Sequence, residues 1–562
     1  MNSRPSEAAG NNRIDRRTGW TIAALLVGFA LIIMAPRPDG MKPEAQRLAA
    51  VTFLMAGLWV TQAVSLAATS LLPLALFPLL AIQPAKDVSK AFVSDKVFLY
   101  LGGFIIALSI ERWNLHRRIA LTIVNRIGAK PRQLVLGFII ATAGLSMWIS
   151  NTASTLLMLP IALALLKTLE DEQSGTTDAG SLTKALTLPL LLGIAYSASI
   201  GGMTTIVGTP TNAQAVELYE KYRSAERDRM DQDAVPDVRP NPATDSTASS
   251  PASNAPAEIS VAQWMVACVP IGLLYVIAVY VVLTWKLPRQ TSHDQAMKQQ
   301  LSNRLRALGS MSTAERRVLI VFVTTAVLWI LRTPLKLGTV TVLPGWSGLA
   351  EPFFDLLGYT PAAGQSPSGF INDSTVAILM AVLLFFLPSG DRDADGRAIP
   401  LMNWETAGRL PWDIVLLFGG GFALAGAFRN DVTGLAGWLG DALQEPLSGQ
   451  SPVVVIAVVC LLMTFLTEFT SNVATISTIL PSLLVLCGPL QIDPRLLMVP
   501  ATLATSCAFM LPIATPPNAI VFGSGRIQVR DMVRYGVFLN LLGVPLLTAA
   551  AYFIIRPLLG IP

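Results

Sequence analysis

The stretch TEFTSNVATISTILP, residues 467–481, places polar side chains and one carboxylate, Glu468, inside an apolar run that covers residues 452–487. Its second part, SNVATISTILP (471–481), matches SNTASTLLMLP (150–160), with the same Ser-Asn start and the same final proline. Two more matching pairs follow the same order in the two halves: YLGGFIIAL (100–108) with LFGGGFALA (417–425), and GTPTNA (208–213) with ATPPNA (514–519). Three ordered matches indicate an internal duplication.

The composition places both halves in a membrane. Of 562 residues, 52% are hydrophobic and 14% are charged, and the mean hydropathy is +0.55. A soluble domain carries about 25% charged residues, whereas many windows of this chain, each as long as the roughly 20 residues that cross a bilayer, carry none. The expected fold class is an all-α polytopic membrane protein with about 11 transmembrane helices plus two re-entrant helical hairpins in an inverted repeat.

Basic residues between the apolar runs orient the chain. Arginines precede the first run, which predicts a cytosolic N-terminus. The remaining basic linkers all fall on the cytosolic side if the broken runs at 133–167 and 452–487 are hairpins, the first entering from the cytosol and the second from outside. The C-terminus is then external, and we expect a multi-pass protein of the plasma (inner) membrane. The predicted spans are 20–36, 47–64, 66–82, 97–111, 185–218, 261–285, 317–333, 373–388, 412–429, 496–522 and 536–556.

The expected segments follow from these runs. Residues 223–259 are rich in Pro, Ser, Ala and Asp, a composition that cannot form a packed core and predicts disorder. The order is a cytosolic N-terminal tail (1–19), scaffold helices (20–96), repeat 1 (97–222) with hairpin 133–167, a disordered external loop (223–259), scaffold helices and linkers (260–411), repeat 2 (412–530) with hairpin 452–487, and a last transmembrane helix (531–562).

The duplicated motifs predict a binding site between the repeats. Each Ser-Asn tip joins two half-helices, and each Thr-Pro segment interrupts a helix. The N–H groups at half-helix N-termini suit an anion, and freed carbonyls with Ser, Thr and Asn oxygens suit a hard cation such as sodium. Isolated Ser and Thr in membrane helices usually bond to their own backbone, but Asn151 and Asn472 occupy matching tips and are the expected site residues.

Glu468 leaves three interpretations open. A carboxylate at this depth is costly and usually functional. We favour a clamp that holds the hairpin through an arginine or backbone donors, with cation coupling and proton carriage as the alternatives.

Enzyme chemistry is not expected. The four cysteines have unrelated spacings and the two histidines lie in charged linkers, so neither a disulfide framework, a metal centre nor a prosthetic group is predicted. The chain also lacks a Walker loop for ATP phosphates.

The motifs TEFTSNVAT (467–475) and CAFMLPIATPPNAIVFGSG (507–525) resemble those of the divalent anion:sodium symporter family, which includes bacterial dicarboxylate and citrate carriers. The resemblance covers the transmembrane chain without the N-terminal tail and the loop at 223–259. It implies a homodimer in which each subunit has a scaffold domain and a transport domain that moves like an elevator and carries two sodium sites.

Site residues carry over by position from this resemblance. It implies a first sodium site at Ser146, Ser150, Asn151, Thr205 and Gly208, and a second at Thr467, Thr470, Asn472 and Ala514. The substrate carboxylates would lie between the tips, against Ser150, Asn151, Thr152, Thr209, Pro210, Ser471, Asn472, Val473, Thr515 and Pro516.

Two positions depart from the family pattern. Val473 has no hydroxyl, although many bacterial relatives have one at this position, which leaves the preferred di- or tricarboxylate open. Thr211 replaces the proline found at the matching position of the second repeat, and we expect only local loosening there.

The expected function is sodium-driven uptake of a C4 dicarboxylate such as succinate, malate or fumarate. Neither site segment contains Lys or Arg, so bound Na⁺ would balance the charge of the substrate. The alternatives are a sodium-independent dicarboxylate exchanger and a citrate or sulfate carrier, and from other classes an ion channel or an intramembrane hydrolase. The expected partners are the small dicarboxylate, membrane lipid and a second subunit, without nucleic acid.

Overall fold

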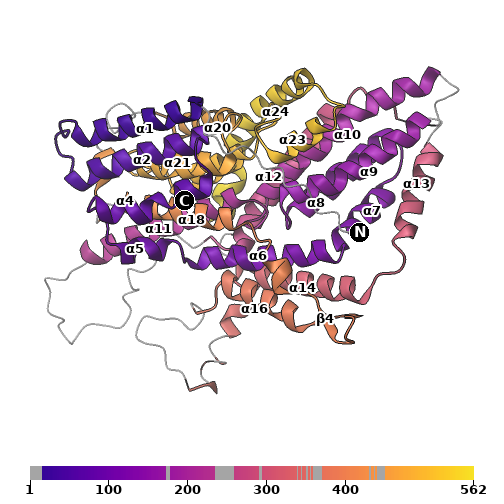
Figure 1. The fold of residues 1–562 in the computed structure, drawn as a ribbon, viewed down its shortest axis with the longest axis horizontal. Coiled ribbons are helices and arrows are strands. Elements are labelled where there is room, and N and C mark those ends of the chain that lie inside the picture. Colours follow the sequence, from indigo (N-terminus) through magenta and orange to yellow (C-terminus); the bar gives the residue numbers. More distant parts are fainter. Residues whose placement is uncertain are drawn as a thin grey trace.

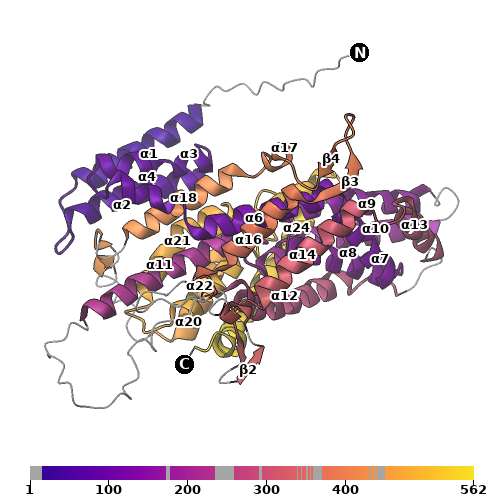
Figure 2. The same cartoon turned by 90° about the horizontal axis from the view of Figure 1, so that it is seen from below.

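The computed structural model of the chain describes residues 16–561, apart from 172–176, 234–258, 290–293 and short stretches within 338–369 and 429–449. The described part is an elongated bundle of helices, with α1 and α2 at one end and α7 and α13 at the other (Figure 1, Figure 2). Most of the predicted tail and residues 234–258 of the predicted loop lie outside the described residues.

All regular secondary structure in the described residues of the first half is helical. Its helices are α1 (Arg16–Met34), α2 (Pro43–Thr61), α3 (Leu66–Ser70), α4 (Leu72–Leu79), α5 (Ala85–Ala91), α6 (Asp95–Arg112), α7 (Leu115–Ile127), α8 (Pro131–Ser146), α9 (Asn151–Asp171), α10 (Thr177–Met203), α11 (Pro210–Asp233) and α12 (Val261–Thr284).

The second half adds two small antiparallel β-hairpins to its helices. Its elements are α13 (Asp294–Ala307), α14 (Thr313–Ile330), β1 (Leu335–Leu337), β2 (Val340–Leu343), the 3₁₀ helix η2 (Trp346–Leu349), α16 (Asp373–Phe386), β3 (Pro388–Arg392), β4 (Ala398–Pro400), α17 (Trp404–Ala407), α18 (Trp412–Ala427), α20 (Pro452–Leu466), α21 (Asn472–Leu486), α22 (Pro494–Thr505), α23 (Pro516–Gly523), α24 (Val529–Ala550), the π-helix η4 (Ala551–Ile555) and α25 (Arg556–Leu558).

The duplication seen in the sequence recurs in the packing. Helices α8 and α9 form a hairpin that packs on α10, and α20 and α21, which the second tip joins, both pack on α22. The second arm of each hairpin also contacts the broken helix of the other repeat, α9 against α23 and α21 against α11. The two repeats therefore interlock around the two hairpins.

Seven helices in the described part of the chain are long and apolar enough to cross a membrane, and four shorter apolar helices accompany them. Two of the seven, Asn151–Glu170 and Asn472–Leu490, include the second arms of the predicted hairpins. A helix of 20 residues is about 30 Å long, which equals the hydrocarbon thickness. Length alone therefore does not distinguish a re-entrant arm from a span, and the count of eleven spans stays a prediction.

Three predicted segments differ from the structure. The loop expected to be disordered from residue 223 begins as helix, because α11 continues to Asp233. The span expected at 66–82 is split into α3 and α4, since the chain turns at Leu71 and Pro73 then begins a new helical turn. The linker between the predicted spans 317–333 and 373–388 contains the paired strands β1 and β2.

A buried ion pair joins three helices outside the repeats' hairpins. Arg332, just after α14, lies 2.5 Å from the carboxylate of Asp373 on α16, and the two side chains are 5% and 3% exposed. The second carboxylate oxygen of Asp373 accepts the N–H of Val261 at the start of α12 at 3.0 Å. Each oxygen of this buried carboxylate therefore has a donor, as burial of a charge requires.

A second ion pair fixes α7 to the start of α14. The Arg118 guanidinium binds both carboxylate oxygens of Glu315 at 2.9 and 3.1 Å, and Ser312 donates its N–H to the same carboxylate at 2.7 Å. Glu315 precedes the predicted span at 317–333. Burial acts to raise the pKa of Glu315, but the hydrogen bonds and charge of Arg118 and the Ser312 N–H outweigh it and leave the pKa below its usual 4.5.

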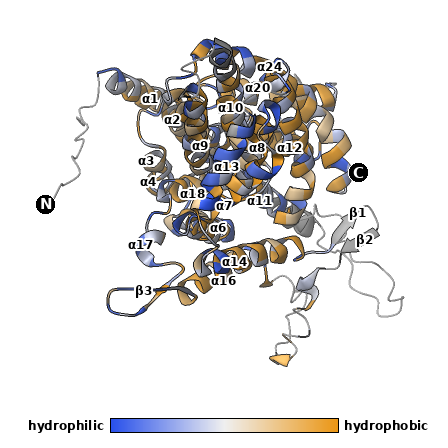
Figure 3. Ribbon diagram, turned by 90° about the vertical axis from the view of Figure 1, so that its right-hand side faces the viewer, coloured by the Kyte–Doolittle hydropathy of each residue, from blue (hydrophilic) through white to orange (hydrophobic). Residues whose placement is uncertain are grey.

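The surface carries the hydrophobic faces that a bilayer requires. Helices α12 and α24 are hydrophobic along much of their length, whereas α13 is hydrophilic (Figure 3). Large apolar side chains of α12, Leu273, Leu274 and Ile277, are exposed on the described chain. Such a continuous apolar exterior is stable against lipid tails and not against water.

Candidate functional site

The first hairpin tip is closed by Ser146 and Asn151. The Ser146 hydroxyl lies 2.7 Å from Asn151 Oδ1 and 2.7 Å from the Ala198 carbonyl of α10, so two acceptors share its one proton. Ser150 caps α9, because its Oγ accepts the N–H of Ala153 at 3.2 Å. The tip is thus tied both to itself and to α10.

The second tip repeats this arrangement with a threonine. The Thr467 hydroxyl lies 2.7 Å from Asn472 Oδ1 and 3.2 Å from the Thr505 carbonyl at the end of α22. Ser471 caps α21 by accepting the N–H of Ala474 at 3.1 Å. Two tips that differ in sequence therefore share one hydrogen-bonding pattern, in which the predicted asparagines hold the same place.

The break between α10 and α11 is held by side chains that replace the missing helical hydrogen bonds. Asn212 donates its amide protons to the carbonyls of Gly202 and Thr205 at 3.0 and 2.7 Å. The Thr205 hydroxyl lies 2.5 Å from the Met147 carbonyl of the hairpin tip and accepts the N–H of Gly208 at 2.9 Å. Thr205 therefore ties the tip to the break.

The break between α22 and α23 is held in the same way by Asn518. Its amide donates to the carbonyls of Ala508 and Leu511 at 2.9 and 3.0 Å, and the Thr515 hydroxyl caps α23 by accepting the Asn518 N–H at 3.3 Å. Asn212 and Asn518 were not among the predicted site residues. The asparagine shared by GTPTNA and ATPPNA was the signal that could have found them.

In both of these asparagines the side-chain oxygen is the atom that the hydrogen bonds described above do not use. The Oδ1 atoms of Asn212 and Asn518 are buried and accept no hydrogen bond within the described part of the chain. An unpartnered buried oxygen is costly, and it occurs here at the same place in both breaks.

Two glycines allow the first tip to approach the first break. A Cβ atom at Gly202 would lie 2.2 Å from Asn151 Oδ1, and one at Gly208 would lie 2.5 Å from the Gly202 carbonyl. Both distances are too short for any side chain. Gly208 was predicted as a sodium ligand, and its place in the structure gives it a packing role as well.

Glu468 binds backbone and amide donors, not an arginine. Its carboxylate accepts the N–H groups of Met510 and Leu511 at 2.9 and 3.0 Å and the Asn540 amide of α24 at 2.7 Å. These contacts tie the second hairpin to the second break and to α24. They match the clamp interpretation with backbone donors.

The two repeats make the contact between tip and break in opposite ways. In the first repeat the side chain belongs to the break, where the hydroxyl of Thr205 meets the Met147 carbonyl of the tip. In the second repeat the side chain belongs to the tip, where the carboxylate of Glu468 meets the Leu511 N–H of the break. In the second repeat, the Glu468 carboxylate therefore makes the contact between tip and break that the Thr205 hydroxyl makes in the first.

The aromatic residues of the two tips lie in different surroundings. Trp148 stacks on Trp329 of α14 with ring centroids 6.4 Å apart and meets Phe322 edge-on at 5.1 Å. Phe469, which precedes the second Ser-Asn pair as Trp148 precedes the first, is 69% exposed. The first tip is therefore docked on α14 while the aromatic residue of the second is not buried.

The other predicted residues of the first repeat lie at the start of α9 and α11. Thr152 is half-buried in the first turn of α9, and Pro210 is the first residue of α11. The Thr209 carbonyl accepts a hydrogen bond from the buried Tyr100 hydroxyl, which also donates to the Ile206 carbonyl at 2.6 Å.

The other predicted residues of the second repeat divide into two groups. Pro516 begins α23 next to the buried Ala514, so both lie at the second break. Thr470 instead bonds within its own hairpin, to the Thr475 hydroxyl at 2.6 Å and the Leu466 carbonyl at 3.0 Å. Val473 packs against an apolar cluster formed by α2, α4, α5 and α18. Thr470 and Val473 are therefore not joined to the hydrogen bonds of Thr467 and Asn472.

A side-chain hydrogen bond links the two halves next to the site. Gln214 of α11 donates to the Ser477 hydroxyl of α21 at 2.5 Å. The four segments that form the tips and breaks contain no Lys or Arg. An anion held here would meet neutral N–H and O–H donors, and its charge would need a bound cation.

A family described as citrate transporter has a sequence model that matches residues 56–488 of this chain. The chain belongs to the citrate transporter (CitMHS) family. The match includes both hairpins and the first break, and membership in a transporter family excludes the enzyme alternatives.

Relatives of known name agree with this family. Two proteins named sodium-dependent dicarboxylate transporter SdcS are similar over nearly their whole length. That of Staphylococcus saprophyticus is 37% identical over 553 residues, 98% of this chain and 93% of the relative. That of Staphylococcus aureus strain MRSA252 is 36% identical over 551 residues, 97% of this chain and 93% of the relative. The resemblance to divalent anion:sodium symporters is thereby confirmed.

The fold is shared with a more distant solved structure. Neisseria gonorrhoeae MtrF, which is described among antimetabolite efflux pumps, covers 95% of this chain and 97% of its own at 13% identity, with a TM-score of 0.52. The expected all-α polytopic membrane fold is confirmed.

Proposed function

We propose that this protein couples the inward movement of sodium to the uptake of C4 dicarboxylates such as succinate, malate and fumarate. The observation that carries the proposal is the duplicated hydrogen-bonding pattern of the tips, Ser146 with Asn151 and Thr467 with Asn472. The relatives named sodium-dependent dicarboxylate transporter support the same assignment.

The sodium sites are proposed at the two breaks. Hydroxyl, amide and carbonyl oxygens are the ligands that a hard cation prefers. In the first half these are Ser146, Ser150, Asn151, Thr205 and Gly208, and in the second Thr467, Asn472 and Ala514, with Thr470 further along the hairpin. The unpartnered Oδ1 atoms of Asn212 and Asn518 add one buried acceptor to each break.

The substrate is proposed to lie between the tips. The first turns of α9, α11, α21 and α23 begin at Asn151, Pro210, Asn472 and Pro516, and helix N-termini offer unpaired N–H groups to a carboxylate. Because no Lys or Arg is available in these segments, a dianion binds well only when sodium is also bound. Reciprocal affinity of this kind couples the two solutes.

Movement of the two hairpins together would carry the loaded site across the membrane. We infer an elevator-type motion of the repeats' hairpins and broken helices against the remaining helices, in a homodimer of the plasma membrane with a cytosolic N-terminus and an external C-terminus. Cross-linking of single-cysteine variants in membranes, together with accessibility of cysteines placed at each terminus, tests the dimer and the orientation.

Alanine substitution of the tip asparagines tests the site. We expect Asn151→Ala and Asn472→Ala to abolish sodium-driven uptake of labelled succinate in proteoliposomes, because each removes the acceptor of a tip hydroxyl and a proposed ligand. Asn303→Ala, at an exposed position of α13, is the matched control. Normal transport by both tip variants, with unchanged thermal stability, would refute the assignment.

The same assay separates the rival functions. Accumulation that follows the imposed sodium gradient supports symport, whereas stimulation by internal dicarboxylate without any need for sodium indicates an exchanger. Competition by citrate or sulfate reveals a different substrate class. Conductance that does not saturate with substrate indicates a channel.

A further inference from the structure

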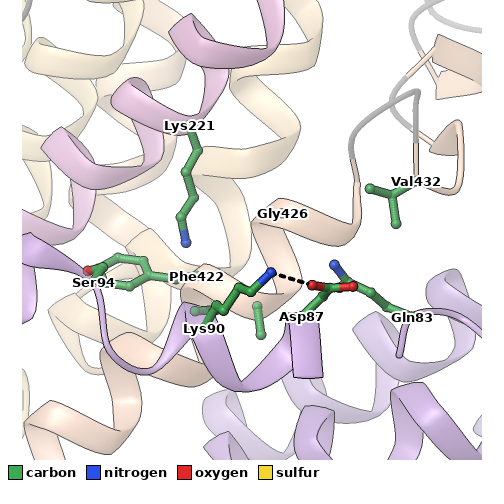
Figure 4. Close-up of a pocket in the computed structure, with 10 residues that line it drawn as sticks. Gln83, Asp87, Lys90, Ser94, Lys221, Phe422, Gly426 and Val432 are labelled. Carbon is green, nitrogen blue, oxygen red and sulfur yellow. Dashed lines mark hydrogen bonds and ion pairs between the residues drawn. The ribbon is translucent and has the colours of Figure 1, made fainter. Parts of the chain in front are cut away.

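A cavity with two lysines in its lining lies away from the tips. It has a volume of about 340 Å³ and is lined by residues of α5, α11 and α18 (Figure 4). This volume is within the range of small-molecule sites. None of the residues proposed for the substrate or for sodium lines it.

Two ammonium groups reach the cavity from different elements. Lys221 of α11 extends toward Phe422 of α18, with its Nζ 4.5 Å from the ring centroid, and Lys90 of α5 lies opposite (Figure 4). A cation over an aromatic face is held in place while it stays able to bind an anion. The cavity therefore brings two ammonium groups together, and that of Lys221 is held over the Phe422 ring.

Each lysine already has an acidic neighbour, and the two pairs differ in burial. Lys90 lies 2.7 Å from the carboxylate of Asp87, and their side chains are 68% and 43% exposed. Lys221 lies 3.6 Å from Glu217, one helical turn away, and these side chains are 24% and 6% exposed. An exposed pair such as Lys90–Asp87 contributes about 0–1 kcal/mol, so a second carboxylate competes readily with Asp87 for Lys90.

Neutral donors complete the cavity. The Ser94 hydroxyl, at the start of α6, is buried and has no hydrogen-bond partner within the described residues. Gln83 lies beside the carboxylate of Asp87 at the rim (Figure 4). A hydroxyl and an amide next to two ammonium groups form a set of donors suited to a carboxylate.

The cavity and the proposed substrate site lie along one helix. Helix α11 begins at Pro210 beside the first break and reaches Lys221 about 16 Å further along its axis. Gln214, which bonds Ser477, lies two turns before Lys221 and so on the same face of α11. Phe422 stacks on Phe418, which meets Tyr100, the residue bonded to Thr209.

We propose that this cavity is a low-affinity vestibule for the transported dicarboxylate, in which Lys90 and Lys221 hold a carboxylate before it reaches the tips. The inference rests on the proposed function. The site segments contain no cation of their own, whereas the cavity holds two ammonium groups, and a carboxylate of the dianion would replace Asp87 at Lys90. Lys221 lies midway along α11, between the first break and the end that leads to the predicted external loop.

Substitutions that remove either a positive or a negative charge test the vestibule. Initial rates of labelled succinate uptake are measured in intact transport-deficient bacterial cells at low ionic strength and fixed sodium. We expect Lys90→Gln and Lys221→Gln to raise KM about three- to tenfold without lowering the maximal rate. Asp87→Asn should lower KM about twofold, because it removes the competing carboxylate. Lys86→Gln, an exposed lysine of the same helix outside the cavity, should keep the wild-type KM.

Salt provides an independent measurement. The distance over which charges act on each other falls from about 10 Å at 0.1 M ionic strength to about 3 Å at 1 M. Added choline chloride should therefore bring the KM values of the variants together. A purely structural ion pair would make Lys90→Gln and Asp87→Asn shift KM in the same direction. That result, or a wild-type KM in both lysine variants, overturns the vestibule. Absence of succinate accumulation by the wild-type protein instead overturns the proposed function.

Discussion

Substitution of Glu468 by glutamine measures what the buried carboxylate contributes. All three neighbours of Glu468 are donors, the N–H groups of Met510 and Leu511 and the amide of Asn540. An ionised carboxylate fits three donors, whereas a glutamine side chain turns its own NH₂ group toward at least one of them. The substitution therefore weakens every contact and leaves one donor without an acceptor.

The free-energy cost of Glu468→Gln can be worked out from its three hydrogen bonds. Hydrogen bonds to a charged group contribute about 1.5–3 kcal/mol and neutral ones about 0.5–1.5 kcal/mol, so three weakened bonds amount to about 3 kcal/mol. The relief of burying a charge offsets part of this. A remaining loss of about 1.4 kcal/mol already shifts the equilibrium of the clamped tip by about tenfold.

The assay is the sodium dependence of succinate uptake combined with thermal unfolding in detergent. Because Glu468 holds the break that contains Ala514 and Thr515, we expect Glu468→Gln to raise the half-saturating sodium concentration about tenfold and to lower Tm. Glu405→Gln makes the same chemical change at an exposed position of α17 and should change neither quantity. Asn540→Ala removes one of the three donors and should show a smaller effect of the same sign.

Two results would refute this reasoning. If Glu468→Gln has the wild-type Tm and sodium dependence, the carboxylate is not a clamp that relies on its charge. If the variant loses all uptake but keeps its Tm, Glu468 takes part directly in cation coupling or proton carriage.

Three further changes probe other parts of the fold. Gly202→Ala should abolish uptake because its methyl group would collide with Asn151 Oδ1, whereas Gly144→Ala should leave uptake intact, because Gly144 has open space around it in the first arm of the hairpin that carries Asn151. Asp373→Asn should destabilise the protein by about 3–5 kcal/mol, because a buried guanidinium loses its carboxylate, and thermal unfolding or limited proteolysis measures the loss. The lowered pKa of Glu315 means that it stabilises the fold above about pH 4.5 and that this contribution disappears as pH falls through its folded-state pKa. In a pH series of Tm values, Glu315→Gln should lower Tm at pH 7 and converge with the wild type in acid.

The tips and breaks of the candidate site were predictable because their signals are local. A hairpin tip in an apolar run requires polar residues, and a broken helix requires residues that cap it, so Ser-Asn and Thr-Pro-X-Asn mark both features. Repetition of these marks in one order predicted which segments pair. The same reasoning missed Asn212 and Asn518, because their role depends on carbonyls seven and ten residues earlier in each break.

The boundaries of segments were less predictable. Residues 66–82 are as apolar as a span, but Leu71 ends one short helix and Pro73 lies in the first turn of the next. Helix α11 continues past the predicted start of the loop because its polar residues are good helix formers. Hydropathy measures the solvent that a segment prefers and not where its helix stops.

The sequence by itself determined the membrane fold class, the duplication, the two tips and the neutral character of the site, because each depends on residue type and order along the chain. Only the tertiary structure decided the partners of Glu468, the exchange of tip and break roles between the repeats, and the cavity between Lys90 and Lys221. It also decided that Trp148 is docked on α14 while Phe469 is exposed. These features join residues far apart in the chain, and such contacts are set by how helices pack and not by local pattern.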